Sequence, residues 1–299
     1  MGTPIPMPQL MLEPAVLERE PVQAAPGSHG ALRLVVARVA GRTRIVDLEC
    51  TGPIQVLRCH HLDPEAPDIA SVMIASPSGG VLQGDRLRID VEVRAGGRLV
   101  LETQSATRLY RMPDRPARIE ARFAVERDAR LGYVPDPYIP FAGSNTTIDT
   151  TVVVDPTAAV LIGEVVAAGR VARGEIFEMT RFASMLTAVR PSGQLLFTDA
   201  TVLEPGEPLG DPGMMASNRA IGSLYLIADE ADATTFRAAI LPDAAHPAFS
   251  GASTLPNRSG SWLRVLAADT GGAREVILAG SDRARAAVLG SAGPRSRRP

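Results

Sequence analysis

A glycine-rich stretch, SPSGGVLQGD, occupies residues 76–85 and has the spacing of a phosphate-binding loop, with four residues between Gly79 and Gly84. Such a loop carries a lysine after its second glycine and opens a helix, so that a cation and backbone N–H groups meet the phosphate. Asp85 stands in the lysine position, and the residues after it alternate as a strand does. The stretch therefore excludes a nucleotide site of this kind. Two interpretations stay open: a structural turn, which glycines entering a strand usually mark, or a loop that presents Asp85 as a functional carboxylate.

The residues Cys59, His60 and His61 carry side chains that bind zinc and nickel readily. Neighbouring residues of an extended chain point to opposite sides, so three in a row rarely share one ion. No second Cys/His pair lies at the spacing of a zinc site, and His29 and His246 are distant in the sequence. We therefore predict no stable metal site, and a weak surface site for nickel or zinc is the alternative.

The chain also lacks several residues and motifs that enzymes use. All 31 basic residues are arginine, so Schiff-base catalysis by lysine is not available. The G-x-S-x-G and H-E-x-x-H signatures of hydrolases are missing as well. A carboxylate-dependent hydrolase stays open as an alternative, although any chain with 33 acidic residues contains Asp and Glu pairs by chance.

Charge and composition narrow the classes of partner. A formal net charge of −2 provides no field that would attract nucleic acid. The apolar runs fall short of the ~20 residues that cross a bilayer. Two cysteines, Cys50 and Cys59, are too few for a disulfide framework, which favours a reducing compartment. We expect a cytoplasmic protein that binds neither nucleic acid nor membrane.

The elements that must position these residues are mostly strands. In RLRIDVEVR, residues 86–94, apolar and charged side chains alternate, which is typical of a half-buried strand. The RAGGR turn at 94–98 then predicts a hairpin with the strand LVLET. No helical pattern of 10–15 residues separates the strands before about residue 200, so we predict a mainly β fold and not a parallel α/β sheet.

A Pro- and Gly-dense link at 204–213 separates this region from a more mixed remainder. There the pattern predicts helices at 233–245 and 281–290, and strands at 261–269 and 274–280.

The chain is expected to fold as a single unit with loose ends. Residues 1–30 are rich in Pro, Ala and Glu, which predicts a loosely ordered leader. Residues 31–290 are predicted to form a single β-rich domain, and residues 291–299 a frayed tail.

The segment VPDPYIPFAGS, residues 134–144, combines three prolines with Tyr138 and Phe141. The prolines fix the backbone in an extended form and remove hydrogen-bond donors, which predicts a stiff segment outside any central strand. Two interpretations stay open here too: an exposed aromatic surface for docking a partner, or a loop packed over the core.

Four motifs follow one another along the chain: PSGGVLQGD at 77–85, TQSATRLYR at 103–111, PDPYIPFAG at 135–143 and GRVARGEIF at 169–177. In this order and spacing they resemble the UreD (also called UreH) family of urease accessory proteins. The match is strong over roughly 70–200 and general in the C-terminal third. Gln83 stands where the family often has glycine, and Arg108 replaces a common lysine.

This resemblance implies an elongated, β-helix-like all-β architecture with a small helical portion in the C-terminal third. It implies a non-enzymatic metallochaperone scaffold that acts with UreF and the GTPase UreG on apo-urease and assists delivery of Ni²⁺. No cofactor would be bound stably, and nickel in transit would cross an internal passage through UreF and UreD. A generic β-rich interaction module is the alternative outside this family.

An ion in transit needs oxygen ligands that bind weakly, because thiolate and imidazole cages would retain nickel. The candidate carboxylates of a nickel path are Asp85, Asp136, Glu164, Glu175 and Asp199. The candidate partner-contact or motif residues are Gly79, Gly80, Gly84, Thr103, Gln104, Thr107, Tyr110, Pro135, Pro137, Tyr138, Pro140, Phe141, Gly169 and Arg170.

Overall fold

The computed structural model describes residues 29–76, 79–205, 209–228 and 248–289, together with positions 234 and 237. The predicted tail lies outside these residues, as does the predicted leader apart from its last two positions. The helix predicted at 233–245 also lies almost wholly outside them.

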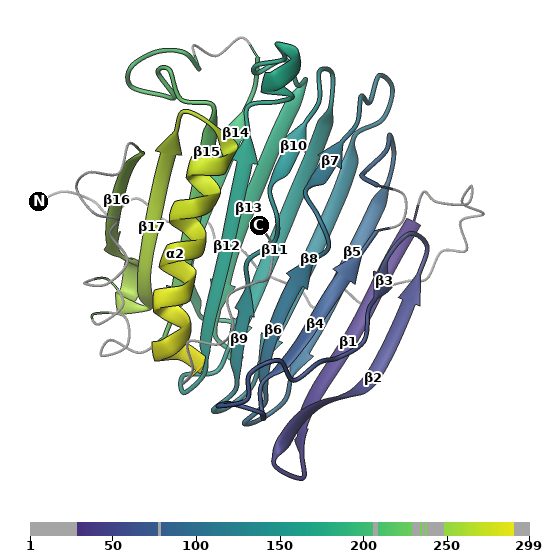
Figure 1. Ribbon diagram of the computed structural model, residues 1–299, viewed down its shortest axis with the longest axis vertical. Helices are drawn as coiled ribbons and strands as arrows, with labels where there is room; N and C mark the ends of the chain where they lie inside the picture. Colours follow the sequence, from purple (N-terminus) through teal and green to yellow (C-terminus); the bar gives the residue numbers. More distant parts are fainter. Residues whose placement is uncertain are drawn as a thin grey trace, which may run out of the picture.

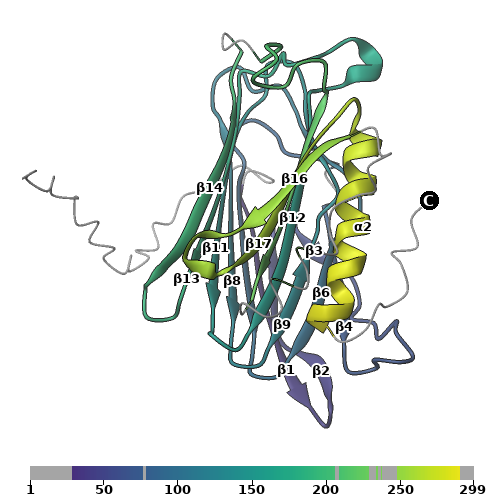
Figure 2. The same cartoon turned by 90° about the vertical axis from the view of Figure 1, so that its left-hand side faces the viewer.

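Two β-sheets form the body of the molecule, stacked face to face (Figures 1 and 2). Sheet A has the order β14-β13-β11-β8-β5-β1-β2. Its strands are β1 (His29–Val39), β2 (Arg42–Thr51), β5 (Arg86–Val93), β8 (Ala117–Val125), β11 (Asn145–Val154), β13 (Arg181–Val189) and β14 (Leu195–Leu203).

Sheet B has the order β16-β17-β15-β12-β9-β6-β4-β3, with two short strands, β7 and β10, beside this path. Its strands are β3 (Gln55–Val56), β4 (Ala70–Ala75), β6 (Arg98–Thr103), β7 (Thr107–Leu109), β9 (Arg130–Tyr133), β10 (Tyr138–Pro140), β12 (Ala159–Ala167), β15 (Ala220–Ile227), β16 (Phe249–Thr254) and β17 (Gly260–Ala267).

The chain winds as a solenoid, because successive strands alternate between the two sheets. Parallel pairing links the strands β1, β5, β8, β11 and β13 in sheet A. It also links the strands β4, β6, β9 and β12 in sheet B. Antiparallel strands complete both ends of each sheet. The predicted mainly β, β-helix-like fold is therefore confirmed.

The hairpin predicted across the RAGGR turn is wrong. β5 belongs to sheet A and pairs in parallel with β1 and β8, whereas β6 belongs to sheet B. Alternation buries one face of a strand whether the chain folds back within a sheet or steps across to the other sheet, so the pattern alone does not separate the two cases. A true hairpin joins β13 to β14.

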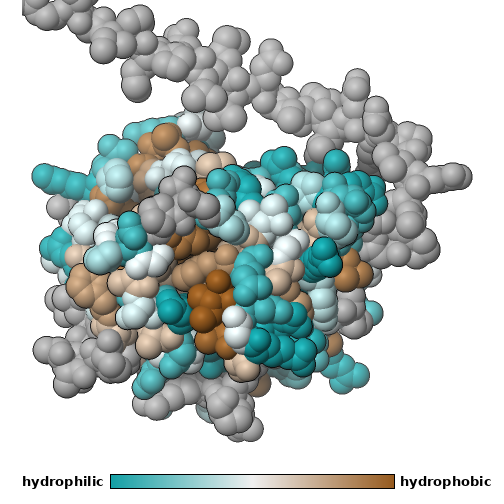
Figure 3. Space-filling view, turned by 90° about the horizontal axis from the view of Figure 1, so that it is seen from above, coloured by the Kyte–Doolittle hydropathy of each residue, from teal (hydrophilic) through white to brown (hydrophobic). Residues whose placement is uncertain are grey.

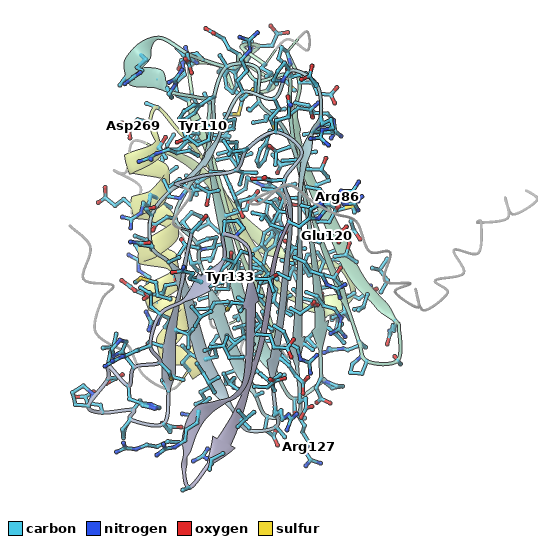
Figure 4. All side chains as sticks on the ribbon, turned by 90° about the vertical axis from the view of Figure 1, so that its right-hand side faces the viewer. Arg86, Tyr110, Glu120, Arg127, Tyr133 and Asp269 are labelled. Atoms are coloured by element: carbon cyan, nitrogen blue, oxygen red, sulfur yellow. The ribbon has the colours of Figure 1, made fainter. Side chains whose placement is uncertain are left out.

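The interior between the sheets is filled by aliphatic and aromatic side chains from both layers. Leu34 and Phe123 of sheet A and Leu101 and Leu131 of sheet B have no accessible surface and belong to one continuous cluster. Full burial of such a side chain stabilises the fold by roughly 1.5–3 kcal/mol. The opposite face of sheet A is charged and solvated, as Arg86 and Glu120 show in Figure 4.

A single long helix, α2 (Thr270–Leu289), covers the outer face of sheet B (Figure 2). The strand predicted at 274–280 is therefore wrong, whereas the helix predicted at 281–290 and the strand at 261–269 are confirmed as α2 and β17. Ala273, Val276, Ile277, Ala284 and Val288 are buried at helical spacing, and the short run of β-branched residues concealed this period. No helix among the described residues is both long and apolar enough to cross a bilayer.

The two ends of the solenoid differ in their connections. Tight turns, such as 94–97 and 126–129, join the sheets at one end, where Figure 4 places Arg127. Longer connections join them at the other, which we call the loop end; their described residues are 76, 79–85, 104–116, 134–144, 168–180, 204–205 and 209–219. The described residues of the four sequence motifs all lie in or beside these connections. Seen from above, the loop end has apolar residues in its middle and polar ones around them (Figure 3).

Candidate functional site

Three of the motifs meet in one cluster at the loop end. The rings of Tyr110 and Phe141 pack edge to face with centroids 5.0 Å apart. The guanidinium of Arg170 lies 4.2 Å from the centroid of the Phe141 ring, a cation–π contact. Arg170 also forms a two-point ion pair with Glu175, which lowers the pKa of that carboxyl. The predicted contact residues Tyr110, Phe141 and Arg170 thus hold one another in place.

The motif glycines allow backbones to approach closely at this end. A methyl group on Gly80 would lie 2.4 Å from the carbonyl oxygen of Arg108. At Gly169, where φ is +142°, it would lie 2.7 Å from the carbonyl oxygen of Glu175. Neither distance is tolerable for a carbon atom, so both glycines are required by packing.

Asp85 closes the loop that contains it. Its carboxylate accepts a hydrogen bond of 2.7 Å from the backbone N–H of Leu82, and its carbonyl oxygen accepts one from the N–H of Arg118. The residue is 4% exposed, and burial raises the pKa of its carboxyl. Asp85 lines neither of the two chambers described below, and these contacts favour the structural interpretation of the glycine-rich loop.

The PDPYIPFAG segment packs over the core. Pro135, Pro137 and Pro140 are buried, and Tyr138 is 8% exposed. Residues 138–140 form the short strand β10, which pairs in parallel with β7 and through one residue with β12. Of the two interpretations of this segment, the structure favours the packed loop over the exposed aromatic surface.

Asp136 of the same segment lies on the α2 side of sheet B. Its carboxylate forms a 3.1 Å ion pair with Arg274 of α2, and its backbone N–H donates to the hydroxyl of Thr103. Both ionised residues line a groove between sheet B and α2. This candidate path carboxylate is therefore separate from the interior of the sandwich, and its charge is compensated.

The interior holds a polar cavity between the strands of the two sheets, which we call the inner chamber. Its volume is about 40 Å³. Its polar lining residues are Tyr133, Tyr138, Thr150, Glu164, Ser184, Asp199, Thr201 and Tyr225. Two of the five predicted path carboxylates, Glu164 and Asp199, are brought together here.

The two carboxylates have different partners. Glu164 of β12 accepts a 2.6 Å hydrogen bond from the hydroxyl of Ser184 on β13. Asp199 of β14 accepts hydrogen bonds from the hydroxyl of Tyr225 on β15 and from the guanidinium of Arg264 on β17. Arg264 thus compensates Asp199, and Glu164 keeps a neutral partner.

Burial raises the pKa of Glu164 to about 7, from a usual value of 4.5. The hydrogen bond from Ser184 and the positive charge of Arg264 oppose this rise, while the negative charge of Asp199 adds to it. The residue retains intermediate accessibility, and it lines the inner chamber. Glu164 is therefore a carboxyl that exchanges its proton near neutral pH.

A second cavity, which we call the outer chamber, lies beneath the loop end and has a volume of about 90 Å³. Its polar side chains come mainly from the second motif, with Ser76 just before the first motif and with Tyr133 and Tyr138, and none of the described lining residues is a carboxylate. The predicted residues that line it are Gly79, Gly80, Thr103, Gln104, Thr107 and Tyr138, with Ser76 and Ser105 beside them.

The Cys59–His61 stretch lies away from both chambers. The ring of His61 is hydrogen-bonded through Nδ1 to the carbonyl oxygen of Ile69, and the backbone of His60 pairs with Ser71. Both cysteines of the chain are free. Within the described ranges, no three His, Cys, Asp or Glu side chains are grouped so as to hold a metal ion.

Comparison with known proteins places this architecture in a family. The model of the UreD urease accessory protein family matches residues 28–299. This chain belongs to the UreD family. The UreD match extends well beyond the motifs and includes the C-terminal strands and α2.

Curated UreD proteins from distant organisms agree with this assignment. The chain is 36% identical to urease accessory protein UreD 2 of Streptomyces griseus, over 84% of this chain and 88% of that protein. It is 34% identical to UreD of Haloarcula marismortui, over 92% of each chain. It is also 34% identical to UreD of Yersinia pseudotuberculosis, over 93% of this chain and 89% of that protein.

Sequence reasoning missed several residues of the inner chamber of this UreD, namely Tyr133, Thr150, Ser184, Thr201, Tyr225 and the neighbouring Arg264. A usable signal existed for Ser184, which stands at an inward position between Phe182 and Leu186 of an alternating strand. A polar residue at an inward-facing position of a strand is an exception, because a buried polar group needs a hydrogen-bond partner.

Proposed function

We propose that this UreD family member is a non-enzymatic scaffold that assists insertion of nickel into apo-urease, in a cytoplasmic complex with UreF and the GTPase UreG. Family membership supports the accessory role. The observation that carries the nickel route is the inner chamber, where Glu164 lies among hydroxyl groups without a positively charged hydrogen-bond partner.

The chemistry of the chamber suits an ion that must leave again. Nickel ranks high in affinity for nitrogen and sulfur ligands, and the chamber lining offers neither imidazole nor thiolate. Hydroxyl oxygens of Ser184 and Thr201 can replace water around the ion, while the ionised form of Glu164 supplies attraction. A conduit requires such intermediate binding, because a tight site would stop transfer.

The remaining predicted carboxylates are less suited to this route. Arg274 compensates Asp136, and Arg170 compensates Glu175. Asp85 is engaged by the backbone of its own loop. We therefore assign the nickel route to Glu164, with Asp199 as a neighbour in the same chamber whose charge Arg264 compensates, and assign the other three to holding the fold.

We place the partner contact at the loop end. Three large apolar side chains of these connections are exposed: Leu82 at 49%, Val171 at 36% and Met214 at 45%. They lie in connections at the same end of the molecule as the Tyr110–Phe141–Arg170 cluster. Exposed apolar side chains gathered in one region are typical of a docking surface, and UreF is the partner we propose for it.

The hydrolase alternative would require two carboxylates free to act on a substrate. Glu164 and Asp199 lie in one chamber, but Asp199 is already bound by Tyr225 and Arg264. The accessory-protein family adds no support for catalysis. We therefore favour the scaffold.

Co-expression tests the proposal. Urease structural subunits are produced with UreF and UreG, with and without this chain, in nickel-supplemented medium. We expect nickel per urease active site and urease activity to fall to background without the chain. Pull-down of UreF with the tagged chain is the accompanying control. Full nickel loading in the absence of the chain would contradict the proposal.

A further inference from the structure

The inner and outer chambers have two lining residues in common, Tyr133 and Tyr138. Each ring faces both cavities, so the pair forms the wall between them. The two phenol groups interact with each other electrostatically, so their hydroxyls lie close together at this wall. Figure 4 shows Tyr133 deep between the sheets, below Tyr110 of the loop end.

Both rings are held firmly by the fold. Tyr133 is 7% exposed and packs against Phe123 at a centroid distance of 5.0 Å. Tyr138 packs against Phe182 at 6.1 Å. Tyr133 stands on β9, which is paired on both sides, and Tyr138 stands on β10, which Pro137 precedes and Pro140 ends. The fold therefore positions both hydroxyls at this wall.

The chambers on either side differ in character. The outer chamber presents hydroxyl and amide groups, and the inner chamber adds the carboxylates Glu164 and Asp199. Any hydrated ion that moves from one to the other meets the two phenol oxygens. These oxygens are neutral and polar, so they can replace water molecules of an ion in turn without retaining it.

We propose that Tyr133 and Tyr138 form a gate between the two chambers, an inference that rests on the proposed nickel route. The two neighbouring phenol groups keep the wall closed. A divalent cation passes it by taking the two hydroxyl oxygens as ligands, and moves on to Glu164. The pair therefore acts in positioning the ion and performs no chemical step.

A double variant, Tyr133→Phe with Tyr138→Phe, tests this gate. It keeps both rings and removes both hydroxyls together, so neither is left buried without the other, a change that is close to neutral for stability. The wall becomes wholly apolar, and an apolar constriction excludes hydrated ions by dewetting. In the co-expression assay we expect nickel per urease active site to fall roughly tenfold or more. UreF pull-down and the melting temperature should stay near wild type.

Glu120→Gln is the control, because this residue lies on the solvated face of sheet A, away from the loop end, and lines neither chamber. We expect it to load nickel normally. Tyr138→Ser adds a second comparison, since it opens the wall and keeps a hydroxyl. A gate predicts more nickel transfer with Tyr138→Ser than with the double phenylalanine variant. A merely structural role predicts the reverse order.

Glu164→Gln in the same assay tests the nickel route independently of the tyrosine gate. Loss of nickel in Glu164→Gln together with wild-type loading in the double phenylalanine variant would overturn the gate and leave the route standing. Wild-type loading in both variants would overturn the route itself. Loss in both, with normal loading in Glu120→Gln, is the result we expect.

Discussion

Replacing Glu164 by glutamine is expected to make the folded chain more stable and, at the same time, to remove most of its capacity to deliver nickel. Burial raises the pKa of Glu164 from 4.5 to about 7, so above pH 7 an ionised carboxylate is held in the interior at a cost. A shift of this size corresponds to about 3 kcal/mol, and water in the chamber makes this an upper limit. Glutamine avoids the cost and can still accept the hydrogen bond of Ser184.

The gain in stability should depend on pH in a defined direction. Below pH 4.5 the carboxyl is protonated in both the folded and the unfolded chain, so glutamine changes little. Between pH 4.5 and 7 the unfolded chain releases its proton while the folded chain retains it, and the cost grows. Above pH 7 the full difference is present. Urea unfolding at pH 8 and at pH 4, followed by circular dichroism, measures it.

Glu120→Gln is the matched control for this experiment. Glu120 lies on the solvated face of sheet A, where its side chain is 51% exposed beside Arg118. Its replacement should change the free energy of unfolding by less than about 0.5 kcal/mol at either pH. If Glu164→Gln is no more stable than the wild-type chain at pH 8, the carboxyl of Glu164 is not desolvated. The raised pKa assigned to it in the inner chamber would then be wrong.

Nickel transfer through this chain is expected to fall roughly tenfold when the pH is lowered from 8 to 6. With a pKa of about 7, Glu164 is ionised in roughly nine-tenths of molecules at pH 8 and one-tenth at pH 6. Only the ionised form attracts a cation. Asp199 is held by Arg264 and Tyr225, so it does not replace the lost charge.

The rate of apo-urease activation by the purified complex provides the measurement. The wild-type rate is divided by that of Glu164→Gln at each pH, because the ratio removes the pH effects of the other components. The ratio should be large at pH 8 and approach one at pH 6. A ratio that does not change with pH would show that ionisation of Glu164 plays no part in transfer.

The fold class and the family could be read from the sequence because they depend on local patterns. Alternating strands and four ordered motifs predicted a β-helix-like UreD architecture. The path of each coil could not be read, since the turn after β5 is compatible with a hairpin or with a step to sheet B. The helical period of α2 was hidden by the short run REVILAG, whose β-branched residues also suit a strand.

The candidate site was predicted only in part, for a physical reason. Glu164 and Asp199 were identified as oxygen ligands, but their partners come from strands far apart in the chain. Tyr225 and Arg264 reach Asp199 because sheets A and B face each other, and the distance between such residues depends on the register of several strands. The sequence also gave no sign that Arg274 compensates Asp136 across 138 positions.

Crystals of the chain in complex with UreF, equilibrated with nickel at pH 8 and measured at the nickel absorption edge, test the nickel route most directly. We predict an anomalous peak in the inner chamber, at bonding distance from the carboxylate of Glu164, and its absence in Glu164→Gln crystals treated in the same way. Nickel bound only at surface groups such as His60, with an empty chamber at saturating concentration, would contradict the account.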